Sequence, residues 1–138
     1  MPLFSKRKDL AVQSFVLKLV NNHSPGLTAR LEGPRLDSRV NLVLVVLIVP
    51  VETDRPQAGR AFAAVTKEFS NKGVAVVVQG PENLDEAILG FRFEGQMTFV
   101  RARAKHRHPM GGGFHQLGFQ LLAVVPPSDC PELASLTL

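Results

Sequence analysis

Apolar and polar residues alternate with a period of two along most of the chain from residue 40 onward, which is typical of β-strands with one buried face. Six segments show this alternation or a β-branched composition, and turn-forming residues separate them: 40–51, 60–69, 73–79, 88–94, 96–108 and 114–125. The connections have hairpin length and contain no helical crossover. The sequence therefore predicts a mainly all-β fold, a six-stranded antiparallel sheet closed into a small barrel.

Residues 10–20 carry two overlapping patterns. Alternation along them suits an extra strand, whereas five apolar residues recur at the spacing of one helix face, with Asp9 as a candidate N-cap. These five are Val12, Phe15, Val16, Leu19 and Val20. We favour the helix, and in either form we expect the apolar side to pack against the barrel core.

The length of 138 residues is that of one compact domain. A turn-forming run at 21–26 separates the first segment from the strands, so we expect an N-terminal extension over 1–30, the barrel domain over 31–125 and a C-terminal tail over 126–138. The tail carries apolar residues that would dock as a short helix: Leu133, Leu136 and Leu138.

Charge and cysteine content narrow the classes of protein. Sixteen Lys and Arg against 12 Asp and Glu favour an anionic partner, and ten of the cations are Arg, which suits forked phosphate contacts. The single Cys130 excludes an internal disulfide framework and a multi-thiolate zinc site. The longest apolar run, 42–49, is far shorter than the ~20 residues of a membrane-spanning helix. With no signal-peptide core after the first residues, we expect a cytoplasmic protein.

Two short motifs occur together in this β context. Arg35 and Arg39 are four positions apart just before the first strand, and Glu68, Ser70 and Gly73 lie at the predicted turn between the second and third strands. This pairing resembles the PilZ domain family, whose pattern is RxxxR followed about thirty residues later by (D/N)xSxxG. The resemblance covers roughly residues 34–124, and Glu68 stands where the family has Asp or Asn.

The resemblance implies a bacterial receptor for cyclic di-GMP that changes conformation and passes the signal to a protein partner. Arg35 and Arg39 would clasp the phosphates and contact guanine. Ser70 would supply a hydroxyl, Gly73 a positive φ and a close approach, and Glu68 an acceptor for the guanine edge. Because the Glu68 side chain is one methylene longer than Asp, the alternative is a degenerate PilZ-like interaction module that does not bind the ligand.

Three histidines could in principle meet at one hairpin. His106 and His108 are two residues apart on a predicted strand, and His115 returns on the next strand after a glycine-rich turn. No carboxylate or thiolate lies in the same hairpin as a fourth ligand, so we predict no metal site.

The fifth strand also carries cations at alternating positions: Arg101, Arg103, Lys105 and Arg107. On one strand face they would form a basic stripe, which could be an ordinary solvated face, bind nucleic acid or aid electrostatic capture of the nucleotide. The chain has no Trp or Tyr for base stacking, which argues against nucleic acid. No nucleophile elbow, phosphate-binding glycine loop or catalytic carboxylate pair is present, so we expect a non-enzyme with no cofactor apart from the cyclic di-GMP ligand.

Overall fold

The computed structural model describes residues 3–23, 39–80, 84–126 and 128–138. One helix, α1 (Leu3–His23), precedes the strands, and a 3-10 turn occurs before the fourth strand and in the C-terminal tail. The strands are β1 (Val40–Asn41), β2 (Val45–Glu52), β3 (Arg55–Pro56), β4 (Phe62–Phe69), β5 (Gly73–Gln79), β6 (Glu86–Phe93), β7 (Gln96–Gly111) and β8 (Phe114–Val125). The 3-10 turns are η2 (Ala58–Arg60) and η3 (Pro131–Leu133).

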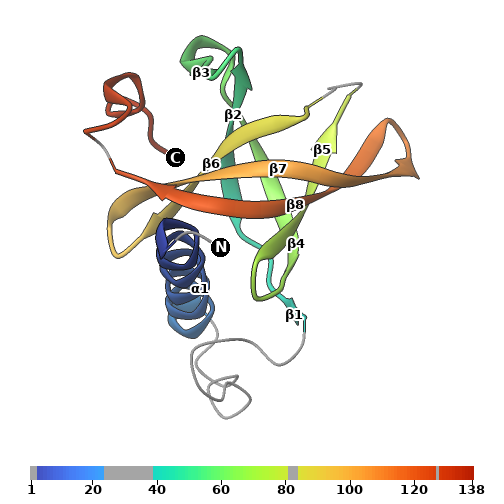
Figure 1. Cartoon of the computed structure of the whole chain (residues 1–138). Coiled ribbons are helices and arrows are strands. Elements are labelled where there is room, and N and C mark those ends of the chain that lie inside the picture. The colour runs from blue at the N-terminus through green and yellow to red at the C-terminus, as the bar shows by residue number, and fades with distance from the viewer. Residues whose placement is uncertain (1–2, 24–38, 81–83, 127) are drawn as a thin grey trace.

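Six of the strands form a closed antiparallel barrel in the order β4, β5, β8, β7, β6, β2 (Figure 1). The ring closes because β2 pairs with β6 through Leu47 and Gly90 and also with β4 through Val46 and Ala64. The short strands β1 and β3 extend the sheet beside β4 and β2. The prediction of a six-stranded antiparallel barrel with an N-terminal element is confirmed.

The first predicted strand, 40–51, is interrupted in the structure between β1 and β2. Both pieces pair with β4, and the residues between them bulge out of the ladder. Thr66 fills this gap: its hydroxyl donates to the carbonyl oxygen of Leu42 at 2.7 Å and accepts from the Leu44 amide at 2.8 Å. The interruption could not be predicted from the uniformly β-branched composition, because it depends on the pairing with β4.

The interior of the barrel is filled by inward-facing side chains and by one face of α1. Phe15 on the helix lies with its ring centroid 5.7 Å from that of Phe91 and 6.0 Å from that of Phe93. The helical alternative for residues 10–20 is thus confirmed, and its five apolar residues are all buried. The helix begins at Leu3, so Asp9 lies within it and the N-cap prediction is wrong.

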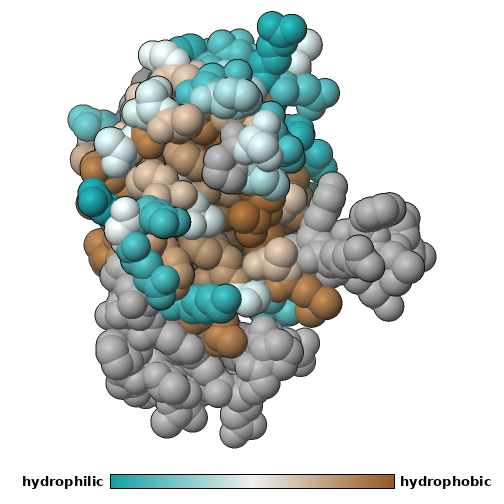
Figure 2. All heavy atoms as spheres, turned by 90° about the vertical axis from the view of Figure 1, so that its left-hand side faces the viewer, coloured by the Kyte–Doolittle hydropathy of each residue, from teal (hydrophilic) through white to brown (hydrophobic). Residues whose placement is uncertain are grey.

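A second apolar cluster lies outside the barrel, where the C-terminal tail covers β2, β6 and β7. Leu47 and Val49 face outward from β2 and pack with Leu133 of η3, so β2 is buried on both faces, as its unbroken apolar composition requires. Hydrophobic residues gather in the middle of this face of the molecule, with hydrophilic residues above them (Figure 2). The predicted short C-terminal helix is therefore a 3-10 turn that docks through Leu133.

Candidate functional site

A pocket of about 470 Å³ opens on the outer face of the barrel beside the β4–β5 turn. Four of the five predicted ligand-binding residues line it: Arg39, Glu68, Ser70 and Gly73. The fifth, Arg35, lies outside the described residues. Lys72 and Lys105 also line the pocket, so cations outnumber its single carboxylate.

The pocket exists because two small residues lie in the middle of one cross-strand row. Glu68 pairs with Ala75, Ala75 with Gly118, and Gly118 with His106. Directly opposed residues of an antiparallel sheet share a face, so Ala75 and Gly118 form a low floor between larger side chains. Three strand spacings place the backbones of Glu68 and His106 about 14 Å apart along the sheet.

Arg39 and Glu68 form an ion pair at the rim of this pocket, with Nη1 and Oε1 3.0 Å apart. Arg39 directly precedes β1, and the pairing of Asn41 with Glu68 brings the two side chains together. The Arg39 side chain is 75% exposed and that of Glu68 only 20%. The carboxylate is therefore fixed in the pocket wall, while most guanidinium donors of Arg39 face solvent and are available to an anion.

Gly73 is required for space rather than for an unusual backbone angle. The prediction of a positive φ at Gly73 is wrong: the glycines with positive φ lie elsewhere in the described chain. A Cβ at this position would lie 3.0 Å from the carbonyl oxygen of Phe119 and 3.1 Å from the Ser70 hydroxyl. The Ser70 amide also donates to the Gly73 carbonyl at 2.9 Å, so this turn packs tightly against β8.

A β-bulge in β7 changes the expected faces of that strand. Ala104 pairs with Phe119, but the next pair along is His106 with Gly118, which leaves Lys105 as the extra residue. Residues beyond the bulge therefore exchange faces. His106 points outward, as Arg103 does, whereas Arg107 stands opposite the buried Leu117. The prediction that the four cations of β7 share one face is wrong.

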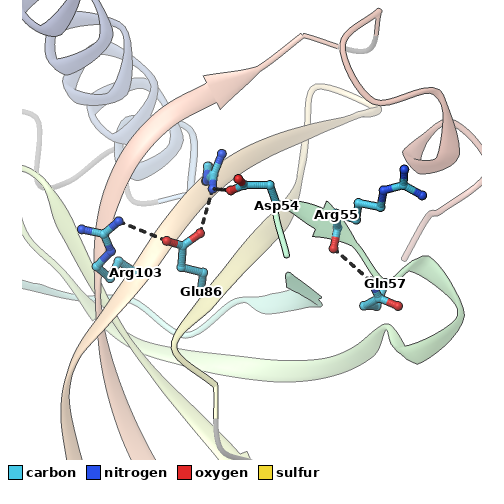
Figure 3. Close-up of polar contacts among 6 residues, drawn as sticks. Asp54, Arg55, Gln57, Glu86 and Arg103 are labelled. Carbon is cyan, nitrogen blue, oxygen red and sulfur yellow. Dashed lines mark hydrogen bonds and ion pairs between the residues drawn. The ribbon is translucent and has the colours of Figure 1, made fainter. Parts of the chain in front are cut away.

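Two of those cations are also neutralised by acids. Arg101 donates to Glu86 at 2.8 Å and to Asp54 at 3.0 Å, and Arg103 donates to the other carboxylate oxygen of Glu86 at 3.0 Å (Figure 3). Hydrogen bonds from Arg101 and Arg103 lower the pKa of Glu86 below its ordinary value. This part of β7 is a local ion-pair network, so the predicted basic stripe does not run along the strand.

The far half of β7 contributes residues that sequence patterns did not assign to the ligand site. Lys105, His106 and His108 line the pocket together with Gln116 of β8. The two imidazoles are nearly parallel, with ring centroids 6.4 Å apart and an interplanar angle of 17°. No local composition signal marks the bulge, because it depends on how β7 and β8 are aligned.

His115 does not join the other two histidines. It pairs with the buried Val78 and so belongs to the inner face, whereas His108 pairs with Gln116 on the outer face. Its Nδ1 is buried and has no hydrogen-bond partner. Within the part of the chain that the structure describes, no three His, Cys, Asp or Glu side chains gather in a way that could hold a metal ion.

Comparisons with known proteins show a structural likeness but no family. No model of a known protein family matches the chain, and no curated protein matches it. Among solved structures, the chain is similar to the Bacillus subtilis inhibitor of motility, MotI/DgrA, with 15% sequence identity and a TM-score of 0.49. The likeness covers 65% of this chain and 43% of that one, so the chain spans less than half the length of that protein.

Among the described helices, none is long and apolar enough to cross a membrane.

Proposed function

We propose that this chain is a cyclic di-GMP-binding, PilZ-like receptor or adaptor that passes the second-messenger signal to a protein partner. One observation carries the proposal: Arg39, Glu68, Ser70 and Gly73, which come from two separate sequence motifs, line a single pocket. Its volume of about 470 Å³ lies within the range of small-molecule sites.

The side chains of the pocket match the chemistry of a cyclic dinucleotide. Arg39 offers forked donors to phosphate, and Lys72 and Lys105 add positive charge. The carboxylate of Glu68 can accept hydrogen bonds from the donor edge of guanine, and the Ser70 hydroxyl can donate or accept one. In this arrangement Arg39 keeps its bond to Glu68 through Nη1 and uses its other donors on the ligand.

Signal transfer would follow from contacts between the ligand and the arginine-bearing segment. Arg39 is held to the barrel by one exposed ion pair, a contact that contributes about 1 kcal/mol or less. A bridging phosphate would add contacts from Arg39 and, by the family pattern, from Arg35. The ligand thereby favours one arrangement of this segment, and the altered surface engages the partner.

Calorimetric titration with cyclic di-GMP tests the proposal, with GTP as the comparison ligand. We expect saturable heat from the natural chain and a loss of at least tenfold in affinity in the Arg35→Ala, Arg39→Ala double variant. The matched control is Arg107→Ala, which removes an exposed cation that does not line the pocket. An absence of heat from the natural chain, or equal binding by the double variant, would reject the proposal.

A second candidate is a degenerate PilZ-like interaction module that does not bind cyclic di-GMP. The observation that favours it is the Arg39–Glu68 contact, in which the two groups that should hold the ligand hold each other. On this alternative, Glu68→Asp shortens the carboxylate, breaks that contact and creates binding where the natural chain has none. Strong binding by the natural chain would exclude this alternative.

A further inference from the structure

We propose that His106 and His108 form an aromatic wall of the pocket that binds the purine base of the nucleotide ligand by stacking. This inference rests on the proposed function and assigns the base-binding side of the same site. It gives the two histidines a role as specificity-determining residues. The resemblance of the sequence motifs to a known family assigns them none.

The bulge at Lys105 turns both imidazoles toward the pocket. Without the extra residue, His106 would continue the inner row of Ala104 and would point into the barrel. With it, His106 pairs with Gly118 and His108 with Gln116 on the outer face. Bulges commonly re-aim side chains in this way beside binding sites.

Gly118 lies beneath the His106 ring of the wall. A Cβ on Gly118 would lie 3.5 Å from both Cβ and Cδ2 of His106, so the imidazole rests directly over this glycine. Ala75 is the next residue of the same row toward Glu68. A base stacked against the imidazoles therefore lies over Ala75, on the side toward the Glu68 carboxylate.

The chemistry of the two imidazole rings suits contact with a base. They are nearly parallel, and within the described residues neither they nor Lys105 has an acidic partner, in contrast to Arg101 and Arg103 on the same strand. With no Trp or Tyr in the chain, the aromatic side chains of this pocket suited to contact a base are the imidazoles. Phe69 and Phe119 also line the pocket, but both side chains are buried in the core. Base stacking on aromatic side chains is sequence-tolerant and strong enough to determine affinity.

Titration of histidine variants with cyclic di-GMP tests this assignment. We expect His106→Ala, His108→Ala to weaken binding about five- to hundredfold, which is the usual effect of losing one stacked base. His106→Phe, His108→Phe keeps flat rings and should bind within about threefold of the natural chain. Arg107→Ala, the neighbour on the opposite face, should bind unchanged. Equal binding by the alanine variant, or a loss in the phenylalanine variant as large as in the alanine variant, would overturn the stacking wall.

A second readout separates this inference from the proposed function. The imidazole NMR signals of the natural chain are followed during addition of cyclic di-GMP, GMP or inorganic phosphate. Shifts of the His106 and His108 signals with GMP, but no binding of cyclic di-GMP, would support the wall and reject the proposed ligand. Shifts with phosphate alone of the same size as with GMP would show an anion site without base stacking and overturn the wall. If cyclic di-GMP releases heat in the calorimeter but no nucleotide shifts these signals, the stacking wall is wrong and the proposed function stands.

Discussion

Thr66 is the residue that allows one long apolar segment to fold as two strands. It is 1% exposed, and both of its hydrogen bonds satisfy backbone groups that have left the ladder. This role cannot be identified from the sequence, because Thr is a common strand residue and its partner strand is not known from the sequence. The role is a property of the register between β2 and β4.

Replacing this hydroxyl should be costly. Thr66→Val keeps the shape but leaves the Leu42 carbonyl and the Leu44 amide unpaired, and we expect the free energy of unfolding to fall by about 1–3 kcal/mol. Hydrogen exchange at the Leu44 amide should accelerate at least tenfold. Thr66→Ser is the control, because it retains the hydroxyl. Equal protection of Leu44 in the valine variant would show that these bonds contribute nothing.

Glu86 gives the fold an acid-sensitive contact. Because Arg101 and Arg103 lower its pKa in the folded state, its contribution to stability is present above its ordinary pKa of 4.5 and is lost as the pH falls through the lowered value. We expect Glu86→Gln to lower the free energy of unfolding by about 1 kcal/mol at pH 7. We also expect the free energy of unfolding to fall less steeply in acid in this variant than in the natural chain. Urea unfolding between pH 3 and 7 measures both effects.

The matched control for that experiment is Glu52→Gln. Its ion pair with Arg60 is more than half exposed on both sides, so solvent should screen it. We expect its pH profile to follow that of the natural chain. If both variants reduce the loss of stability in acid equally, the Arg101–Glu86–Arg103 network is not the cause of the acid sensitivity.

At the scale of elements, the sequence predicted the ends of the strands better than it predicted which side chains point inward or outward. The bounds of β5 and β8 match the predicted 73–79 and 114–125, because turn residues flank both. The faces of β7 were wrong beyond Ala104, because simple alternation assumes an unbroken ladder. The same error hid His106 and His108, which line one pocket together with Arg39, Glu68, Ser70 and Gly73.

Two glycines of neighbouring strands should respond oppositely to the same substitution. At Gly73 a methyl group would press on the Phe119 backbone carbonyl, which cannot move without disturbing β8, so Gly73→Ala should destabilise by about 1–3 kcal/mol. At Gly118 the new contact of 3.5 Å is ordinary, and the loss of unfolded-state freedom should make Gly118→Ala neutral or slightly stabilising. Thermal unfolding of both variants checks the contrast, and a similar fall in the two would contradict it.

At the scale of the whole molecule, α1 and the barrel share one core. Leu19 is fully buried against the barrel and Leu10, on the same helix, is 57% exposed. We expect Leu19→Ala to cost about 2–5 kcal/mol and Leu10→Ala less than 0.5 kcal/mol. Helix and sheet signals in circular dichroism should be lost in a single transition. A helix transition separate from that of the barrel, or equal effects of the two variants, would show that α1 is an independent appendage.

The overall architecture followed from the sequence because its signals are local. Hairpin-length connections and two-residue alternation are sufficient for an antiparallel barrel. The closure of the ring between β2 and β4, and the burial of β2 on both faces, depend on contacts between distant segments. Such long-range contacts cannot be predicted from the pattern of residues in any one segment.

The contact between α1 and β8 also has a consequence in time. The ribosome releases α1 before β8, which it packs against and which follows about 90 residues later, a delay of roughly 5–20 s at usual synthesis rates. During that interval the apolar face of α1 has no barrel to cover it. Every newly made copy therefore passes through a stage in which Phe15 and Leu19 are available to chaperones, and to other nascent chains on the same messenger.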